Sequence, residues 1–443
     1  MSRIFYFRLM DNTIAKIYSL FLEYGRVFTD SRMSENGGLY FALKGERFDG
    51  NSYAISSVGN GAHYAIVDQE EIALKSDKLI LVPNVLEALQ KLANHHRRQF
   101  NIPILAITGT NGKTTTKELI TSVLRQKFNV LSTEGNLNNH IGVPLTLLQI
   151  NSEHDIAVIE MGANHVGEIE FLCNIAEPDY GIITNVGKAH LEGFGSFEGV
   201  KKAKGELYRF IANYGKAIFI NADNSHLLEM SAGNNLKFTY GVNNDTAELK
   251  GSLAGNNIYI TAKVLFPKGW LYFKTKLTGA YNLENILAAA RIGTHLNIDP
   301  LQIQQGIESY VPENNRSQVS QKGGATFIVD CYNANPTSMQ ASIDNFAGIM
   351  QSNKVYVLGD MLEMGDDSEK EHQQIVDKLL QMKADNVFLI GTCFKETEDN
   401  KAFRKFNTID EFIENVEPVF WTGKFVLLKG SRGIRLEKVL ETL

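Results

Sequence analysis

One segment constrains the fold of this chain more than any other, because an apolar strand pattern passes directly into a glycine-containing turn and then a helix. Residues 102–107 read IPILAI, residues 108–115 read TGTNGKTT, and an amphipathic helix is predicted from about Thr115 to Phe128. Backbone N–H groups of such a turn, together with the helix N-terminus, form a concave anion site. The segment therefore predicts a nucleotide-binding α/β domain.

The composition of the turn assigns roles within this predicted site. Lys113 is expected to reach the β- and γ-phosphates, and the Thr114 hydroxyl is expected to hold Mg²⁺. The longer form of this motif has glycine six residues before its lysine, where this chain has Ile107, so the match is to a shorter loop. The alternative is an ordinary strand–turn–helix whose glycines serve only positive φ. The other loop residues expected to contact the nucleotide are Gly109, Thr110, Asn111, Gly112 and Thr115.

Strand and helix patterns alternate along most of the chain, which predicts parallel sheets built from right-handed βαβ units. After Lys250 the pattern changes to two short alternating runs, followed by a helix over 282–296. A second α/β series starts near Phe327. The first hundred residues mix short apolar runs, at 39–43, 64–67 and 79–82, with helical pattern, and the alternating runs lie at 258–264 and 271–277. Strands are predicted at 156–160, 181–186, 217–221, 327–331, 354–358, 387–390 and 425–428.

A chain of 443 residues exceeds what one hydrophobic core usually organises. We expect three α/β domains over residues 1–100, 101–312 and 313–443. The central one is a P-loop ATPase domain with a parallel sheet, and the last is Rossmann-like. The segment Val311–Ser320 is the expected linker.

Charge and cysteine content narrow the function classes. The net charge of −6 argues against nonspecific nucleic-acid binding, which needs basic surface. Cys173, Cys331 and Cys393 are sparse and unpaired in pattern, which favours a reducing cytosol. The apolar stretch 17–22 is too short for a membrane span. We expect a cytoplasmic monomer without a membrane or nucleic-acid partner.

Three further polar residues follow the loop in the sequence. Glu160 ends a predicted strand, His190 follows another, and Lys204 lies on a predicted helix. Strand ends of an open α/β sheet converge on one edge, so Glu160 and His190 are candidates to meet Mg²⁺ there. Each also has an ordinary interpretation: a helix cap, a hydrogen-bonded structural histidine, and a solvated lysine beside Lys201 and Lys202.

With the loop, Glu160, His190 and Lys204 in this order, the chain resembles the Mur ligases. These are three-domain, ATP-dependent enzymes that add amino acids or a dipeptide to UDP-N-acetylmuramic acid, and the resemblance extends over essentially the whole chain. It implies that Lys204 is carbamylated and binds Mg²⁺ together with Thr114, Glu160 and His190. It also implies catalytic roles for Lys113, Glu160, His190 and Lys204.

Motifs before and after the central region extend the resemblance. Residues 29–32 (TDSR) and 38–45 (GLYFALKG) resemble the family's UDP-sugar signature, and residues 138–144 (NNHIGVP) resemble a substrate-proximal loop. The resemblance implies substrate contacts at Ser31, Arg32, Asn138 and Asn139.

Residues 279–285 (GAYNLEN) resemble the segment that approaches the adenine, which implies ATP contacts at Asn282 and Asn285. The family usually has histidine where Tyr281 stands, so the role of Tyr281 is open. Arg316 and Asp330 match the C-terminal arginine and aspartate that reach back to ATP.

Three C-terminal motifs resemble the D-alanyl-D-alanine-adding members of the family: DCYNANP at 330–336, LGDMLEMG at 358–365 and KGSRG at 429–433. Turns at strand ends have similar compositions, which is the alternative interpretation. Cys331 replaces a commoner acidic residue. The substrate contacts implied are Asn333, Asn335, Asp360, Met361, Glu363, Lys429, Ser431 and Arg432.

The resemblance implies that D-alanyl-D-alanine is joined to the terminal carboxylate of a UDP-N-acetylmuramoyl-tripeptide through an acyl phosphate. The product would be the pentapeptide precursor of peptidoglycan, formed with ADP and phosphate. Lysine or a diamino acid remains open for the third residue of the tripeptide. The alternatives are another carboxylate–amine ligase of the superfamily, such as folylpolyglutamate synthase, a kinase, or a P-loop module that binds ATP without ligation.

Overall fold

The computed structural model describes residues 3–188, 191–313, 315–399 and 401–443. The chain divides into two compact units. The first contains residues 1–106, 129–162 and 168–179, and the second contains residues 107–128, 163–167 and 180–443. Three sheets of four, nine and six strands carry most of the core, together with a two-stranded hairpin, β3 (Lys44–Gly45) and β4 (Phe48–Asp49).

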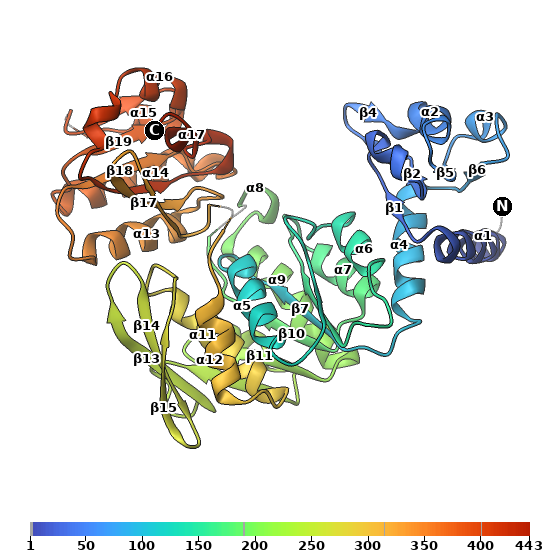
Figure 1. Ribbon diagram of the computed structural model, residues 1–443, viewed down its shortest axis with the longest axis horizontal. Helices are drawn as coiled ribbons and strands as arrows, with labels where there is room; N and C mark the ends of the chain where they lie inside the picture. The colour runs from blue at the N-terminus through green and yellow to red at the C-terminus, as the bar shows by residue number, and fades with distance from the viewer. Residues whose placement is uncertain (1–2, 189–190, 314, 400) are drawn as a thin grey trace. The chain divides into compact units, whose positions relative to one another are not determined.

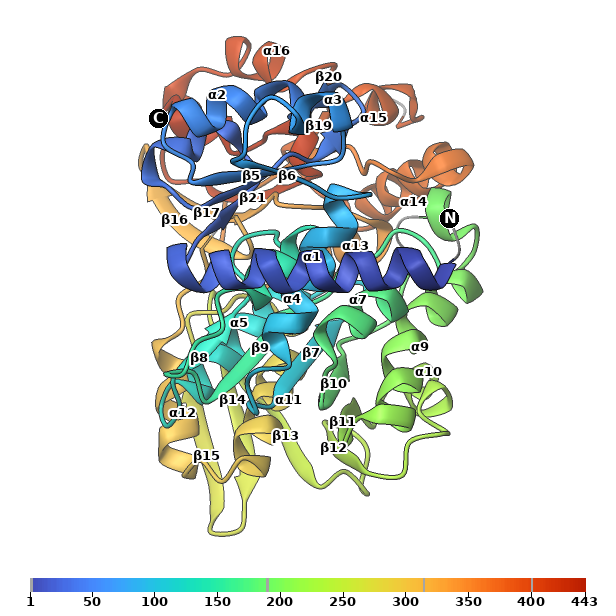
Figure 2. The same cartoon turned by 90° about the vertical axis from the view of Figure 1, so that its right-hand side faces the viewer.

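The first sheet is parallel, and its order is β1 (Val27–Phe28), β2 (Leu39–Phe41), β5 (Tyr64–Val67), β6 (Leu79–Leu81). It precedes α4 (Val85–Arg97), which begins where the Asn84 side chain accepts the Glu87 N–H. Helix α1 (Arg3–Tyr24) was not predicted, and Figure 2 shows it along its length. Its buried residues Ile14, Ile17 and Phe21 share one face at helical spacing.

The nine-stranded sheet has the order β15-β14-β13-β12-β11-β10-β7-β9-β8. The pairs β10–β11, β11–β12 and β8–β9 are parallel, as predicted, whereas β13, β14 and β15 form an antiparallel extension. The strands are β7 (Ile104–Thr108), β8 (Val130–Ser132), β9 (Ile156–Glu160), β10 (Tyr180–Ile183), β11 (Ala217–Asn221), β12 (Lys237–Gly241), β13 (Leu249–Asn256), β14 (Ile260–Phe266) and β15 (Gly269–Lys274).

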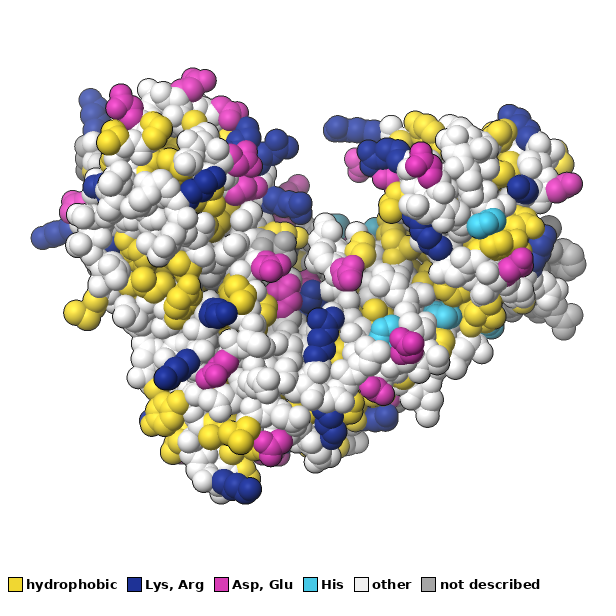
Figure 3. Space-filling model, in the orientation of Figure 1, with side chains coloured by type: hydrophobic (Ala, Val, Ile, Leu, Met, Phe, Trp, Pro, Cys, Tyr) yellow, Lys and Arg dark blue, Asp and Glu magenta, His cyan; other side chains and the backbone are white. Residues whose placement is uncertain are grey.

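Burial distinguishes the two parts of this sheet. Strands β7, β9 and β11 are buried at every position, as expected for strands covered on both faces. Strand β14 alternates between buried and partly exposed residues, so one face of the extension meets solvent. Its neighbour β15 exposes Trp270 and Tyr272, and Figure 3 shows hydrophobic side chains at the surface of this extension.

Helices pack on the central sheet from several parts of the chain. Helix α5 (Lys113–Leu124) lies against α11 (Asn282–His295) and α12 (Pro300–Ser309), as Figure 1 shows. Helix α9 (Phe197–Tyr214) packs on β10 and β11. The contacts with α11 and α12 hold α5 in place, and its first residue follows the predicted phosphate loop.

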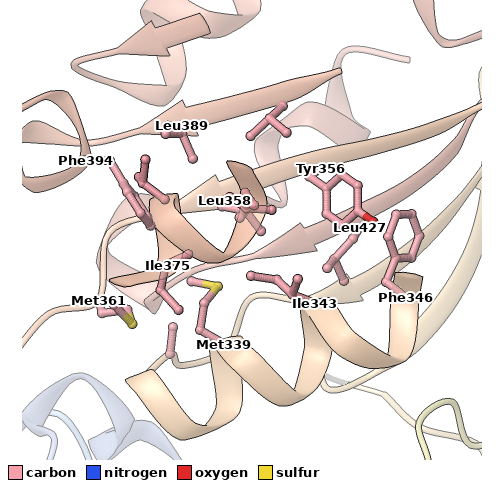
Figure 4. Packing of buried hydrophobic residues seen from close by; sticks show 14 of the residues in the cluster. Met339, Ile343, Phe346, Tyr356, Leu358, Met361, Ile375, Leu389, Phe394 and Leu427 are labelled. Carbon is pink, nitrogen blue, oxygen red and sulfur yellow. The ribbon is translucent and has the colours of Figure 1, made fainter. Parts of the chain in front are cut away.

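The third sheet has the order β16 (Gln318–Lys322), β17 (Ala325–Asp330), β21 (Phe425–Lys429), β18 (Lys354–Gly359), β19 (Val387–Ile390), β20 (Arg404–Phe406). All neighbours are parallel except β16 and β17. The predicted linker Val311–Ser320 is therefore wrong at its end, because β16 begins at Gln318 and pairs with β17. Figure 4 shows α13 (Pro336–Gly348) placing Met339, Ile343 and Phe346 against strand residues.

Within the described parts of the chain, every helix is too short or too polar to cross a bilayer.

Candidate functional site

The predicted phosphate loop joins β7 to α5 with two glycines at positive φ. Gly109 has φ +147°, and a Cβ at this position would stand 2.0 Å from the Thr184 Oγ1 atom. Gly112 has φ +77° and precedes the first residue of α5. The conformation and the lack of space both require glycine at position 109. The loop thereby places the N-terminus of a 12-residue helix at the predicted anion site.

Lys113 folds back over this loop. Its Nζ donates to the carbonyl oxygens of Gly109, at 2.7 Å, and Thr110, at 3.1 Å. The Thr114 side chain is buried at the first turn of α5. The loop residues thus form a compact turn with one ammonium group on it, and phosphate contacts at this turn stay a prediction.

The segment after β10 braces the loop, and the sequence analysis did not identify it. The Thr184 hydroxyl donates to the Asn111 carbonyl oxygen at 2.7 Å. The Asn185 side chain accepts the Asn111 N–H at 2.9 Å and donates to the same residue's carbonyl at 3.1 Å. The signal that could have found them is their place at the carboxyl end of a predicted strand, since ligand-site residues gather there.

Asn282 and Asn285 lie beside the loop, joined in a buried relay. The Thr116 hydroxyl of α5 donates to Asn285 Oδ1 at 2.9 Å, and Asn285 Nδ2 donates to Asn282 Oδ1 at 2.8 Å. Asn282 Nδ2 then donates to the Thr278 carbonyl oxygen at 2.7 Å. The relay brings both asparagines to the phosphate-loop helix, and their contact with adenine stays a prediction.

Glu160 ends β9 and is only 1% exposed. Its Oε1 accepts a hydrogen bond from Asn138 Nδ2 at 2.8 Å, and its backbone N–H donates to the Thr133 hydroxyl. Among the described residues, no group hydrogen-bonds the second carboxylate oxygen, Oε2. A buried anionic oxygen without a hydrogen-bond donor is unfavourable unless a cation binds to it. The carboxylate therefore fits a Mg²⁺ ligand.

Lys204 is 2% exposed, so its interpretation as a solvated surface lysine is wrong. Its Nζ lies 3.3 Å from the Ala163 carbonyl oxygen and 5.2 Å from the centre of the Phe194 ring. Two residues on, buried Glu206 accepts the Gly167 N–H at 2.6 Å. Helix α9 therefore holds the segment 163–167 at both ends. His190 lies outside the described residues.

Asp330, at the end of β17, is surrounded by donors. Its Oδ2 lies 2.9 Å from Lys429 Nζ and accepts the Ser342 hydroxyl at 2.9 Å. Its Oδ1 accepts the Ser317 N–H at 3.3 Å. Lys429 is buried and also donates to the Asn333 carbonyl oxygen. The structure thus brings Asp330 and Lys429 together, although the sequence assigned them to different ligands.

Asn335 connects the C-terminal motif to the phosphate loop. Its Oδ1 accepts the Ser338 N–H as the N-cap of α13, and its Nδ2 donates to Asn111 Oδ1 at 2.8 Å. Lys188 makes a second such link, because its Nζ lies 3.0 Å from the Glu371 carboxylate, whose side chain is 3% exposed. Residues 111 and 188 thereby contact elements that follow β17 in the chain.

Several residues predicted to bind substrate have structural partners. Asp360 is buried, and its two oxygens accept the N–H groups of Cys393 and Phe394 at the start of α15 (Thr392–Glu396). Met361 belongs to the core shown in Figure 4. The Ser431 hydroxyl accepts the Leu362 N–H. These roles are independent of a ligand, and substrate contacts at these positions stay predictions.

Other predicted residues are more accessible. Arg32 forms an ion pair with Asp30 at 2.6 Å and is largely exposed, and Ser31 follows the same aspartate. The Asn139 side chain accepts the backbone N–H groups of Ile141 and Gly142, where α6 (Gly142–Leu147) begins. The remaining exposed positions from the predicted substrate set are Asn333, Glu363 and Arg432.

Of the two positions whose roles were open, Cys331 is buried and Tyr281 is partly buried. The Tyr281 hydroxyl lies 3.0 Å from the Ser317 hydroxyl, and burial raises the tyrosine pKa well above its ordinary value. Burial also raises the pKa of the Cys331 thiol, with the nearby Glu437 carboxylate adding to the shift. The Cys331 thiolate is therefore disfavoured, and Tyr281 contacts the residue just before β16.

Three family models match the chain in succession: the Mur ligase family catalytic domain over residues 23–97, the Mur ligase middle domain over 107–293, and the Mur ligase glutamate ligase domain over 315–432. The UDP-N-acetylmuramoyl-tripeptide–D-alanyl-D-alanine ligase of Haemophilus influenzae is 33% identical over 438 residues, which span 94% of this chain and 93% of that protein.

Solved structures agree with this similarity. The crystal structure of MurF from Acinetobacter baumannii has a TM-score of 0.86 at 31% identity, over 94% of this chain and 92% of that one. The MurF ligase of Thermotoga maritima in complex with ADP has a TM-score of 0.82 at 27% identity, over 94% of this chain and 96% of that one.

Proposed function

Because the chain belongs to the Mur ligase family, we infer that it joins D-alanyl-D-alanine to the terminal carboxylate of UDP-N-acetylmuramoyl-tripeptide and converts ATP to ADP and phosphate. The observation that carries this inference is the match to such ligases over 94% of the chain. The hydrogen bond from Asn335 to Asn111 supports it, because it joins the C-terminal motif to the phosphate loop. The product is the pentapeptide precursor of peptidoglycan.

Ligation requires activation of the carboxylate, because its leaving group would otherwise be oxide. A carboxylate oxygen attacks the γ-phosphorus of ATP, the bond to the β,γ-bridging oxygen breaks, and ADP leaves. The dipeptide amine then attacks the carbonyl carbon of the acyl phosphate and loses a proton. The tetrahedral intermediate collapses with cleavage of the carbon–oxygen bond to phosphate. Phosphoryl transfer of this kind depends mainly on positioning and on charge neutralisation.

In this proposal the phosphate loop supplies both the positioning and the charge neutralisation of the nucleotide. Its backbone N–H groups and the start of α5 face the phosphates in this proposal, with Lys113 as the cation that follows the γ-phosphoryl group. Thr184 and Asn185 hold the loop rigid through Asn111. The other nucleotide contacts that we propose are Gly109, Thr110, Gly112, Thr114, Thr115, Asn282, Asn285, Arg316 and Asp330.

Glu160 and Lys204 fit a role in binding Mg²⁺. Glu160 offers a buried oxygen without a hydrogen-bond donor among the described residues, and Thr114 offers a buried hydroxyl. A carbamate on Lys204, formed from the amine and CO₂ with loss of a proton, would add anionic oxygen donors to a buried side chain. Together with His190, these are the proposed ligands. When bound, Mg²⁺ supplies charge neutralisation at the phosphate oxygens.

The proposed domains are residues 1–100 for the UDP-sugar, 101–312 for ATP and 313–443 for the dipeptide. The first would use Ser31 and Arg32, with Asn138 and Asn139 from the second. Water must be excluded from an acyl phosphate, so we expect the C-terminal domain to close over the phosphate loop during catalysis. ATP use and three free cysteines support a cytoplasmic location.

Mass spectrometry of the product tests this function. With ATP, UDP-N-acetylmuramoyl-tripeptide and D-alanyl-D-alanine, we expect an amide-linked pentapeptide and one ADP for each bond. A panel of single amino acids and L,L-dipeptides as acceptors should give no product. An acyl phosphate without amide, or turnover with glutamate, would instead indicate a kinase or a folylpolyglutamate-type ligase.

The carbamate has its own test. Lys204→Ala should abolish ligation, and short carboxylic acids should partly restore it by supplying the missing oxygen ligands. Bicarbonate should raise the activity of the wild-type protein and leave the variant unchanged. An inactive Lys204→Ala protein that carboxylic acids never restore would contradict the carbamate while leaving the ligase function in place.

A further inference from the structure

Two arginines from distant parts of the chain lie on one aromatic ring. The Arg316 guanidinium carbon is 3.6 Å from the centre of the Tyr332 ring, and the Arg432 guanidinium carbon is 5.4 Å from it. The two distances add to 9.0 Å, which is the largest separation that these two carbons can have. Tyr332 therefore gathers two positive charges into a small volume.

The backbone segment that carries Tyr332 is tied to the neighbouring strand. Tyr332 follows β17, and Arg432 follows β21, which is the parallel neighbour of β17 with Asp330 opposite Lys429. Lys429 donates to the Asn333 carbonyl oxygen at 2.9 Å, so the turns after the two strands are tied together. Carboxyl ends of adjacent parallel strands are where open α/β sheets bind ligands.

The described part of the chain gives neither arginine a carboxylate partner within ion-pair distance. Asp330, two residues before Tyr332, is already paired with Lys429. Like charges repel, so a pair held together by an aromatic face is a binding site for an anion. Arg432 is exposed and Arg316 is half-buried, so an anionic ligand can reach both.

We propose that Tyr332 is a positioning residue that holds Arg432 ready for the C-terminal carboxylate of the incoming dipeptide, with Arg316 beside it for the phosphoryl group. This proposal rests on the proposed function. A guanidinium stacked on a ring keeps its N–H groups free at the edge, where they bind a carboxylate through two parallel hydrogen bonds. The arrangement selects a dipeptide with a free carboxylate over a dipeptide amide or a longer peptide at that end.

The test compares two acceptors, D-alanyl-D-alanine and D-alanyl-D-alaninamide, by the ratio of their kcat/KM values. Arg432→Gln should bring this ratio close to the value expected for an enzyme that does not recognise the dipeptide carboxylate. Tyr332→Leu keeps bulk but removes the aromatic face, so the ratio should fall about tenfold, mainly through a higher KM for D-alanyl-D-alanine. Tyr332→Phe keeps the face and should stay within about twofold of the wild-type ratio.

Arg404→Gln is the matched control, because Arg404 also stacks on two rings, Phe388 at 5.1 Å and Phe406 at 5.5 Å. It should leave the ratio unchanged even where it lowers the thermal unfolding temperature. A folded Tyr332→Leu protein with the wild-type ratio would overturn the proposal, as would a Tyr332→Phe protein that falls as far as Tyr332→Leu.

Misfolding of a variant and failure of the proposed function can both be distinguished from failure of this proposal. Should Tyr332→Leu not fold, Arg432→Gln decides alone, because that side chain is exposed, and a wild-type ratio in it would overturn the carboxylate assignment. Should the wild-type protein form no pentapeptide at all, the proposed function fails first, and that result is visible before any variant is made.

Discussion

Glu160→Gln separates the stability of the protein from its activity. The Glu160 side chain is 1% exposed, Asn138 donates to Oε1, and Oε2 lacks a hydrogen-bond partner among the described residues. Glutamine has nearly the same shape, keeps the bond from Asn138 and removes the buried negative charge. The variant should therefore be the more stable protein without ligands and a much poorer enzyme.

The magnitude follows from the unpartnered oxygen. An unsatisfied buried polar group costs about 1–3 kcal/mol, and more when it is charged. Glutamine still leaves one polar group at that place, so the net gain should be about 1–2 kcal/mol in the free energy of unfolding. This gain corresponds to a rise of about 2–8 °C in the unfolding temperature for a unit of 150–250 residues. Loss of one ligand to Mg²⁺ should lower the ligation rate about 100-fold.

Three measurements check this prediction: urea unfolding without ligands, thermal unfolding with and without Mg²⁺ and ADP, and ligation rates. Magnesium with ADP should stabilise the wild-type protein more than the variant, because a ligand stabilises in proportion to its affinity for the folded state. Glu206→Gln is the matched control. The buried Glu206 carboxylate accepts the Gly167 N–H, so this variant should be less stable than the wild-type protein. A Glu160→Gln protein that is less stable than the wild type, or as responsive to Mg²⁺, would refute the reasoning.

Three further predictions address the loop, the contacts after β10 and the C-terminal sheet. Gly109→Ala places a Cβ 2.0 Å from the Thr184 hydroxyl on a residue with φ +147°. The affinity for ADP, measured by calorimetry, should therefore fall at least about tenfold. Gly233→Ala is the control, because the space around its Cβ is open, and it should bind ADP with wild-type affinity. Lys188→Met leaves the buried Glu371 carboxylate without its ion-pair partner and should lower the unfolding free energy by about 1–2 kcal/mol. The double variant Lys188→Met/Glu371→Gln should recover part of this loss. Equal stability of the single and double variants would argue against a stabilising ion pair. Burial lowers the pKa of His372 below its ordinary value of 6.5, so the unfolded state binds the proton first as the pH falls below 6.5, and stability should decrease by up to about 1.4 kcal/mol per pH unit until the folded pKa is reached. His372→Gln should remove this contribution, which pH-dependent urea unfolding of both proteins would detect.

The local pattern of the sequence determined where most strands lie. Strands 156–160, 217–221 and 387–390 were predicted to the residue, because runs of apolar residues bounded by polar ones carry their own signal. The phosphate loop was likewise readable, since the positive φ at Gly109 and the contact of Lys113 with the Gly109 carbonyl oxygen are both local to one turn. Membership of the Mur ligases followed from the order of such motifs along the chain.

Only the tertiary structure decided which polar residues are buried and what they contact. Lys204 is buried although its neighbours Lys201 and Lys202 make that helix look solvated, because the segment 163–167, some 40 residues away, covers it. Thr184 and Asn185 brace a loop 73 and 74 residues earlier in the chain.

The arginine pair on Tyr332 and the bond from Asn335 to Asn111 likewise join segments that are far apart in sequence. A periodic pattern reports which face of an element is covered, whereas the identity of the covering residue is fixed only when distant strands and helices pack.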